Sequence, residues 1–174
     1  MTNTKSYTTL PKNTNQALGI GVFAVDFLSE AIGEPSKDVL ERTTLFFTDA
    51  VLCGVSAIAT GTNAPKVLRE EALSYQCEAG ATVFGSTKMV RPEKAILANC
   101  AAVREWDSNG TNFGYNLELG NTAGEFGHND FYAVPIAAAQ IMGLDVASVV
   151  RGMLLLDDIR GRLAEVFSLR TYTI

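Results

Sequence analysis

The stretch ANCAAVREWDSNGTNFGYNLELGNTAGEFGHND, residues 98–130, decides the fold because it separates two helical apolar patterns. One helical pattern ends near Trp106, and another begins just after the only histidine, His128. Glycines punctuate the residues between them. A connection of about twenty residues is uncommon in a compact domain unless it is functional or mobile. We therefore expect the functional site in this loop.

Outside this loop, apolar residues recur at helical spacing along almost the whole chain. The patterns predict helices over residues 16–32, 37–59, 65–76, 92–106, 130–142 and 145–167. A short β-type run at 81–85, with 89–90, predicts at most one small hairpin. The expected fold class is all-α (mainly helical), a multi-helix bundle. Residues 1–14 are expected to form a flexible lead-in, and 15–174 a single helical domain.

Several local signals refine this prediction. The pattern at 16–32 is so densely apolar that it predicts a mostly buried helix. The helix at 37–59 is also apolar around much of its circumference, which predicts a place in the middle of a helical layer, and its small residues would allow close approach of a neighbour. Pro135 predicts that the 130–142 helix starts late or kinks. Asp158 and Arg162 are spaced for an i,i+4 ion pair.

The composition excludes several classes of protein. The chain has a net charge of −5 and no cluster of lysine and arginine, so we expect no nucleic-acid partner. Its three cysteines show no metal-binding spacing and are expected to be reduced and buried in a cytosolic protein. The longest apolar runs are interrupted by Asp26 or Asp49 and are shorter than the roughly 20 residues that a bilayer requires. We expect a soluble cytoplasmic protein.

Asp107, Asn109, Thr111, His128 and Asp130 gather in the loop. A histidine just before a helix N-terminus suits a neutral base or a donor to an anionic ligand, although it can also merely help to cap the helix. Asp107 fits a site residue and a solvated turn aspartate about equally well. One histidine with scattered carboxylates is a poor metal site, so none is expected. The glycines match no phosphate-binding motif. The residues alone indicate a helical domain with an anion-facing loop.

Four segments together resemble the MmgE/PrpD family, which includes 2-methylcitrate dehydratase, cis-aconitate decarboxylase and iminodisuccinate epimerase. The matching segments are Ala81–Gly85, Ala98-Asn99, Asp107-Ser108-Asn109-Gly110-Thr111 and His128-Asn129-Asp130, and GLDVASVVRG followed by GRLAE is similar to the next family helix. The chain departs from the family pattern at Cys100, where glycine is usual, at Gly110, where the loop has a second acid, and at Asn129, where proline is usual. The segment between Thr111 and His128 is also longer than usual.

The resemblance implies a cofactor-independent and metal-independent lyase, a dehydratase or decarboxylase. Its substrate would be a di- or tricarboxylate such as methylcitrate or cis-aconitate, and the chemistry would be proton transfer next to a carboxylate. It implies catalytic roles for Asp107 and His128 and a substrate hydrogen bond from Thr111, and we assign Asn109 and Asp130 to substrate binding as well. An epimerase or isomerase of the same family is the alternative, as is a non-catalytic assembly or regulatory subunit.

Family enzymes are more than twice as long as this chain. The resemblance therefore implies that the chain corresponds to the N-terminal part of the family's helical domain, without the α+β lid domain. The remaining catalytic groups of the family, a lysine, a histidine and a tyrosine, come from later segments. We expect a fragment or small subunit that a second polypeptide completes, in a homo- or hetero-oligomer.

Overall fold

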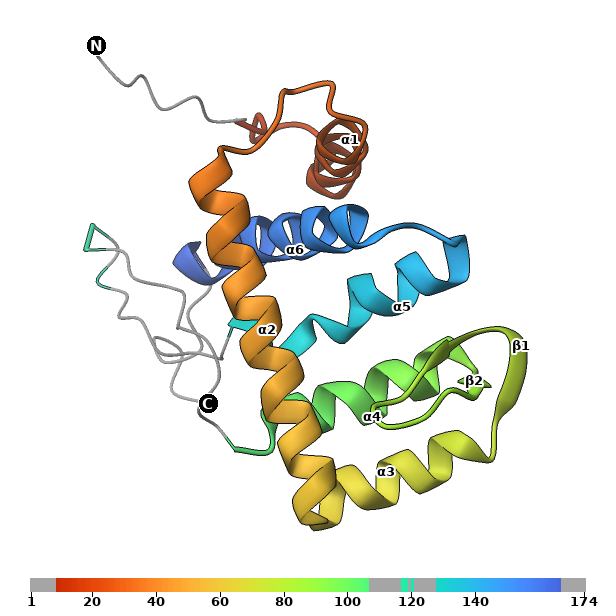
Figure 1. Ribbon diagram of the computed structural model, residues 1–174. Helices are drawn as coiled ribbons and strands as arrows, with labels where there is room; N and C mark the ends of the chain where they lie inside the picture. The colour runs from red at the N-terminus through yellow and green to blue at the C-terminus, as the bar shows by residue number, and fades with distance from the viewer. Residues whose placement is uncertain (1–8, 107–116, 119, 121–127, 167–174) are drawn as a thin grey trace. The chain divides into compact units, whose positions relative to one another are not determined.

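The computed structural model describes residues 9–106, 117–118, 120 and 128–166 (Figure 1). The elements in chain order are α1 (Gln16–Leu28), α2 (Lys37–Thr60), α3 (Asn63–Leu73), β1 (Gln76–Thr82), β2 (Met89–Val90), α4 (Pro92–Arg104), the 3₁₀ helix η1 (His128–Phe131), α5 (Ala133–Met142) and α6 (Val146–Val166). The predicted fold class, mainly helical with one small hairpin, is confirmed for the described residues. The chain divides into two compact units, Met1–Pro35 and Ser36–Ile174.

The first unit contains α1, which overturns one prediction. Asn15 caps this helix by accepting a hydrogen bond from the backbone N–H of Leu18. The helix ends at Leu28, four residues earlier than predicted, and none of its residues is buried. A helix that is apolar all round is typical of a protein interior, but composition cannot say what covers it. Leu18 and Val25 are each about two-thirds exposed in this chain.

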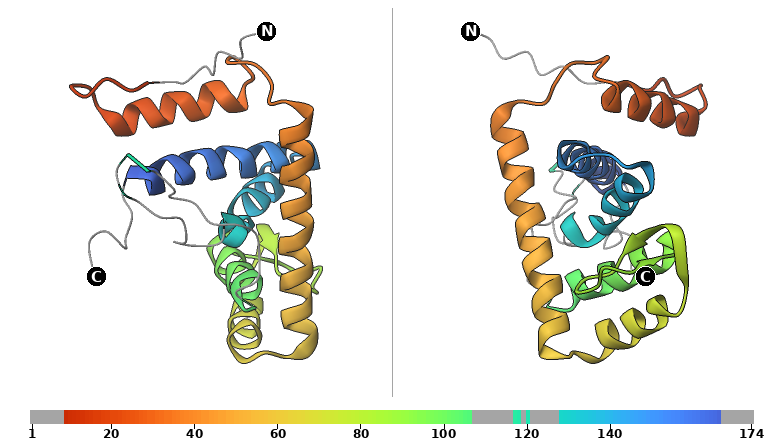
Figure 2. Two further views of the ribbon diagram at one scale, coloured as in Figure 1. Left: turned by 90° about the vertical axis from the view of Figure 1, so that its left-hand side faces the viewer. Right: turned by 45° about the vertical axis from the view of Figure 1, so that its right-hand side comes forward.

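The second unit is organised along α2. Figures 1 and 2 show α3 and α4 beside the C-terminal half of this helix and α6 beside its N-terminal half. Ser36 caps α2 through the backbone N–H of Val39, and Gly61 ends it in the left-handed conformation that favours glycine.

The buried face of α2 is built from small residues: Thr43, Ala50, Gly54 and Ala57. The prediction that α2 lies in the middle of a layer is wrong, because Leu45 and Leu52 are each more than 60% exposed. At Gly54 an added Cβ would lie 2.5 Å from the ring of Phe84, a residue between the two strands and not on a neighbouring helix. By length and composition α2 is apolar enough to cross a membrane, even though Asp49 interrupts its apolar run. Core helices of soluble proteins pass the same test.

The hairpin is antiparallel and irregular. Thr82 pairs with Met89, and both Ala81 and Gln76 pair with Val90, so β1 contains a register shift. The strand begins at Gln76, where a helix was predicted to end, and stops before Val83, where the predicted strand continued. Gly80 is required at the crossing, because an added Cβ would lie 2.1 Å from the carbonyl oxygen of Val90.

The side chain of Asn99 on α4 closes the edge of the hairpin. Its Oδ1 accepts a hydrogen bond from the backbone N–H of Phe84, and its Nδ2 donates to the carbonyl of Thr82, both at 2.9 Å. Gln140 on α5 bonds the backbone N–H and the hydroxyl of Thr82, and Arg69 on α3 donates to the carbonyl of Phe84. Three helices thus hold the A-T-V-F-G segment.

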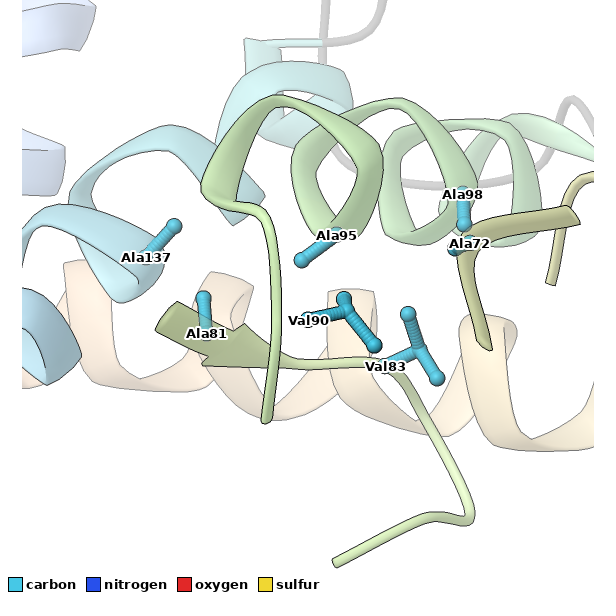
Figure 3. Packing of buried hydrophobic residues seen from close by; sticks show 7 residues of the cluster. All are labelled: Ala72, Ala81, Val83, Val90, Ala95, Ala98 and Ala137. Carbon is cyan, nitrogen blue, oxygen red and sulfur yellow. The ribbon is translucent and has the colours of Figure 1, made fainter. Parts of the chain in front are cut away.

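Two clusters of buried apolar residues form the core. The first lies between the hairpin, α3, α4 and α5 and consists largely of alanine (Figure 3): Ala72, Ala81, Val83, Val90, Ala95, Ala98 and Ala137. The second lies between α2, α4, α5 and α6: Ala50, Val103, Tyr132, Ala139, Val149 and Met153. Small side chains let the helix backbones approach closely. The candidate site described below lies next to the second cluster.

Helix α5 starts later than residue 130, as Pro135 predicted. Residues 128–131 form η1, and α5 begins at Ala133, so Pro135 falls in its first turn, where proline is tolerated. Gly152 of α6 lies against this proline, since an added Cβ would be 2.9 Å from the Pro135 Cβ. The predicted ion pair is also confirmed, with Arg162 Nε 3.7 Å from Asp158 Oδ1.

Candidate functional site

The predicted site residues divide into two groups. Asp107, Asn109 and Thr111 lie outside the described residues. His128 begins η1, and Asp130 lies two residues further along the same turn. The geometry of the site is therefore that of the turn from His128 to Tyr132 and of the helices that contact it, α2, α4 and α6.

The first contact of this turn is with α2. Asn129 is completely buried, and its Nδ2 donates to Asp49 Oδ2 at 3.1 Å and to the carbonyl of Phe46 at 3.3 Å. A buried amide requires such partners, because an unsatisfied polar group in the interior costs about 1–3 kcal/mol. Asp49 therefore has a structural reason to interrupt the apolar sequence of α2.

The second contact is with α4. Asp130 is 6% exposed, and its Oδ2 lies 3.4 Å from Nε of Arg104, at the last residue of the helix. A cation at that position also interacts favourably with the negative end of the helix dipole. The carboxylate of Asp130 is thus held inside the protein by an arginine, and Arg104 itself is partly exposed.

The third contact is with α6, through two consecutive aromatic residues. The guanidinium of Arg160 lies over the ring of Phe131, 4.4 Å from its centroid. Tyr132 is completely buried, and its hydroxyl donates to Asp157 Oδ2 at 2.5 Å. The turn is consequently bonded to three helices within four residues.

Burial dominates the electrostatics of this cluster. It raises the pKa of Asp157 to about 7, although the hydrogen bond from Tyr132 and the charge of Arg160 act in the opposite direction. Burial and the negative charge of Asp157 raise the pKa of Tyr132, and burial lowers the pKa of Arg160. The second carboxylate oxygen of Asp157, Oδ1, is buried, and none of the described residues donates a hydrogen bond to it. Asp157 can thus exchange a proton near neutral pH.

Cys100 borders the cluster from α4. Burial raises the pKa of its thiol to about 11, while the backbone N–H of Ala133 acts in the opposite direction. A thiol with that pKa is protonated at neutral pH and a poor nucleophile. Each of the three cysteines is only partly buried, which corrects the prediction of full burial.

The described residues contain no group of three or more histidine, cysteine, aspartate or glutamate side chains that could hold a metal ion. Beside the turn that begins at His128 lie two arginines, Arg104 and Arg160, and the carboxyl group of Asp157, whose pKa is near neutral. Such an arrangement can bind or balance anionic groups and can hold a proton near neutral pH.

Sequence reasoning missed most of this cluster. Arg104, Tyr132, Asp157 and Arg160 were not predicted as site residues, and Asp49 was noted only as an interruption of an apolar run. That interruption was the one available signal, because a charge in an apolar helix needs a partner. The partner itself, Asn129, lies 80 positions away in the sequence.

Comparison with known proteins gives one family. No curated protein and no solved structure matches the chain significantly. The MmgE/PrpD N-terminal domain matches residues 26–174, which include all of the second unit and both ends of the central loop. This chain belongs to the MmgE/PrpD family and carries its N-terminal domain.

Proposed function

We propose that the chain is the small subunit or N-terminal half of an MmgE/PrpD-type lyase that acts on a di- or tricarboxylate such as methylcitrate or cis-aconitate. The observation that supports this most is the family match across residues 26–174 together with the presence of Asp107, Thr111 and His128 at the matching motif positions. The reaction is dehydration or decarboxylation and needs no organic cofactor or metal.

The proposed chemistry is proton transfer next to a carboxylate. His128 moves the proton or binds a carboxylate, and Asp107 orients the histidine or acts as the acid or base. Thr111 donates a hydrogen bond, and Asn109 and Asp130 contribute to substrate binding. The ion pair between Asp130 and Arg104 supports an indirect contribution of Asp130 to substrate binding, in which its carboxylate positions the Arg104 side chain and does not itself contact an anionic substrate.

We also propose that a second polypeptide completes the site and that the protein is a homo- or hetero-oligomer in the cytoplasm. Exposed apolar side chains support this. In the second unit, Leu52, Met142 and Val146 are each more than 60% exposed, and in the first unit no residue of α1 is buried. Apolar surface on this scale is typical of proteins that bind another chain.

The test is to purify the chain together with any co-encoded partner and to follow conversion of methylcitrate and cis-aconitate. We expect turnover that falls at least about 100-fold in His128→Ala, the usual contribution of a general acid or base. Lys37→Ala is the matched control, because Lys37 is highly exposed on α2. Unchanged activity in His128→Ala contradicts the assigned role, and a fully active isolated monomer contradicts the shared site.

An epimerase or isomerase of the same family would use the same residues and is distinguished by its products, since no water or CO2 is released. A non-catalytic assembly subunit is the third candidate, supported by Gly110 in place of the second acid of the loop and by the exposed apolar surface. A partner chain with its own complete aspartate–histidine loop would favour that candidate, and a partner without one would exclude it.

A further inference from the structure

Asp49 places a carboxylate within an otherwise apolar part of α2. Its side chain is partly buried, and its Oδ2 accepts the hydrogen bond from the completely buried amide of Asn129. The same nitrogen donates to the carbonyl of Phe46, one helical turn earlier on α2. Asn129 is thus bonded to α2 through both a side chain and a backbone atom.

Of the side-chain contacts described above for this turn, the two bonds from the Asn129 amide to α2 lie nearest to His128 in the sequence. Asn129 follows His128 directly, and consecutive Cα atoms are about 3.8 Å apart, so fixing Asn129 keeps the Cα of His128 within that distance of a fixed point. The contacts of Asp130, Phe131 and Tyr132 act two to four residues further along. They orient the turn as a whole, whereas the bond to Asp49 acts at its first peptide.

We propose that Asp49 is a positioning residue for His128. Its carboxylate holds Asn129, and through Asn129 the backbone of His128, against α2. The expected effect of Asp49 on catalysis rests on the proposed function, because that function gives His128 its part in proton transfer. What matters in it is the acceptor oxygen at position 49, not the negative charge.

The chain has a single histidine, which provides a readout that needs no substrate. In an NMR spectrum of the isotope-labelled full chain, combined with an unlabelled partner where one is needed, the imidazole signals of His128 are free of overlap from other histidines, and their pH titration gives its pKa. We expect Asp49→Ala to move these signals and the titration midpoint. Asp49→Asn should stay close to the wild type, because its amide oxygen can accept the same hydrogen bond. Asp38→Asn, at an exposed position in the first turn of the same helix, is the matched control.

Two results would overturn the proposal. One is an unchanged His128 signal in a folded Asp49→Ala variant, with folding checked by circular dichroism. The other is the same shift in Asp49→Asn as in Asp49→Ala, because it would show that the charge and not the acceptor acts on His128. If Asp49→Ala does not fold, Asp49→Glu is measured in its place. This variant keeps the negative charge but displaces the acceptor oxygen by one methylene group. An unchanged His128 signal in Asp49→Glu also overturns the proposal.

Turnover gives the second readout. In the active complex, Asp49→Ala is expected to lower kcat about 10-fold to 100-fold with a smaller change in KM, as a misplaced catalytic group does, and Asp49→Asn to restore most of it. A complex in which the wild type converts none of the substrates would refute the proposed function, and the NMR comparison would still decide the role of Asp49.

Discussion

The proton on Asp157 gives the sharpest prediction for this fold. Burial raises the pKa of Asp157 from 3.8 to about 7. Below pH 3.8 the folded and unfolded chains both hold the proton. As the pH rises toward 7, the unfolded chain loses its proton while the folded chain keeps it. The stability that this group contributes is therefore present at low pH and is lost as the pH rises through about 7.

The size of the effect follows from the two pKa values. Each pKa unit corresponds to about 1.4 kcal/mol, so the full difference is worth at most about 4 kcal/mol. The side chain of Asp157 is only partly buried, and solvent screening reduces this to about 2 kcal/mol. The variant Asp157→Asn removes the titration and keeps an oxygen that can accept the hydrogen bond from Tyr132.

The assay is urea unfolding at several pH values from about 4 to 8. We expect the stability of Asp157→Asn relative to the wild type to rise by about 2 kcal/mol over this range. The neighbouring Asp158→Asn is the matched control: Asp158 is 40% exposed and forms a surface ion pair with Arg162, worth less than about 1 kcal/mol. A difference between Asp157→Asn and the wild type that stays constant across the pH range would refute the reasoning.

Three further predictions concern the packing around the hairpin and the cluster. Asn99→Ala should lower the free energy of unfolding by about 2–3 kcal/mol in urea, because two backbone groups lose their partner; a loss under about 0.5 kcal/mol would contradict this. Gly80→Ala should cost about 2 kcal/mol or more, since its Cβ meets the carbonyl of Val90. Gly21→Ala is the control: its added methyl group lies in open space, so the substitution should be neutral or stabilising. Equal unfolding midpoints for Gly80→Ala and Gly21→Ala would contradict the steric requirement for glycine at position 80. Cys100 should resist iodoacetamide near neutral pH until the chain unfolds, as read by peptide mass spectrometry, because burial raises its pKa to about 11; rapid labelling of the folded chain would argue otherwise.

Much of the secondary structure could be predicted because its signals are local. Ser36 accepts a hydrogen bond from the backbone N–H of Val39 at the start of α2, and Asp145 accepts one from the backbone N–H of Ser148 at the start of α6. Glycine ends α2 and α5 in the left-handed conformation, at Gly61 and Gly143. A cap or a stop depends on neighbours within about four residues, so the sequence contains the whole of the interaction.

The hairpin and the burial of the apolar helices were predicted less well. β1 begins five residues before the predicted strand, because its pairing with Val90 and its hydrogen bonds to Asn99 and Gln140 outweigh local propensity. The apolar density of α1 predicted burial, yet none of its residues is buried. Periodicity shows that a face is apolar but contains no information about what lies against it.

For the candidate site, the sequence by itself indicated the residues that we propose for the chemistry. His128 lies at the start of a helical turn, and the motif positions of the family are present in the chain. What only the tertiary structure decided is how that turn is held. Asp49 and Asn129 are 80 positions apart, and Tyr132 and Asp157 are 25 apart. Such pairs form because packing brings α2 and α6 against one turn, and the burial that raises the pKa of Asp157 exists only after that packing is complete.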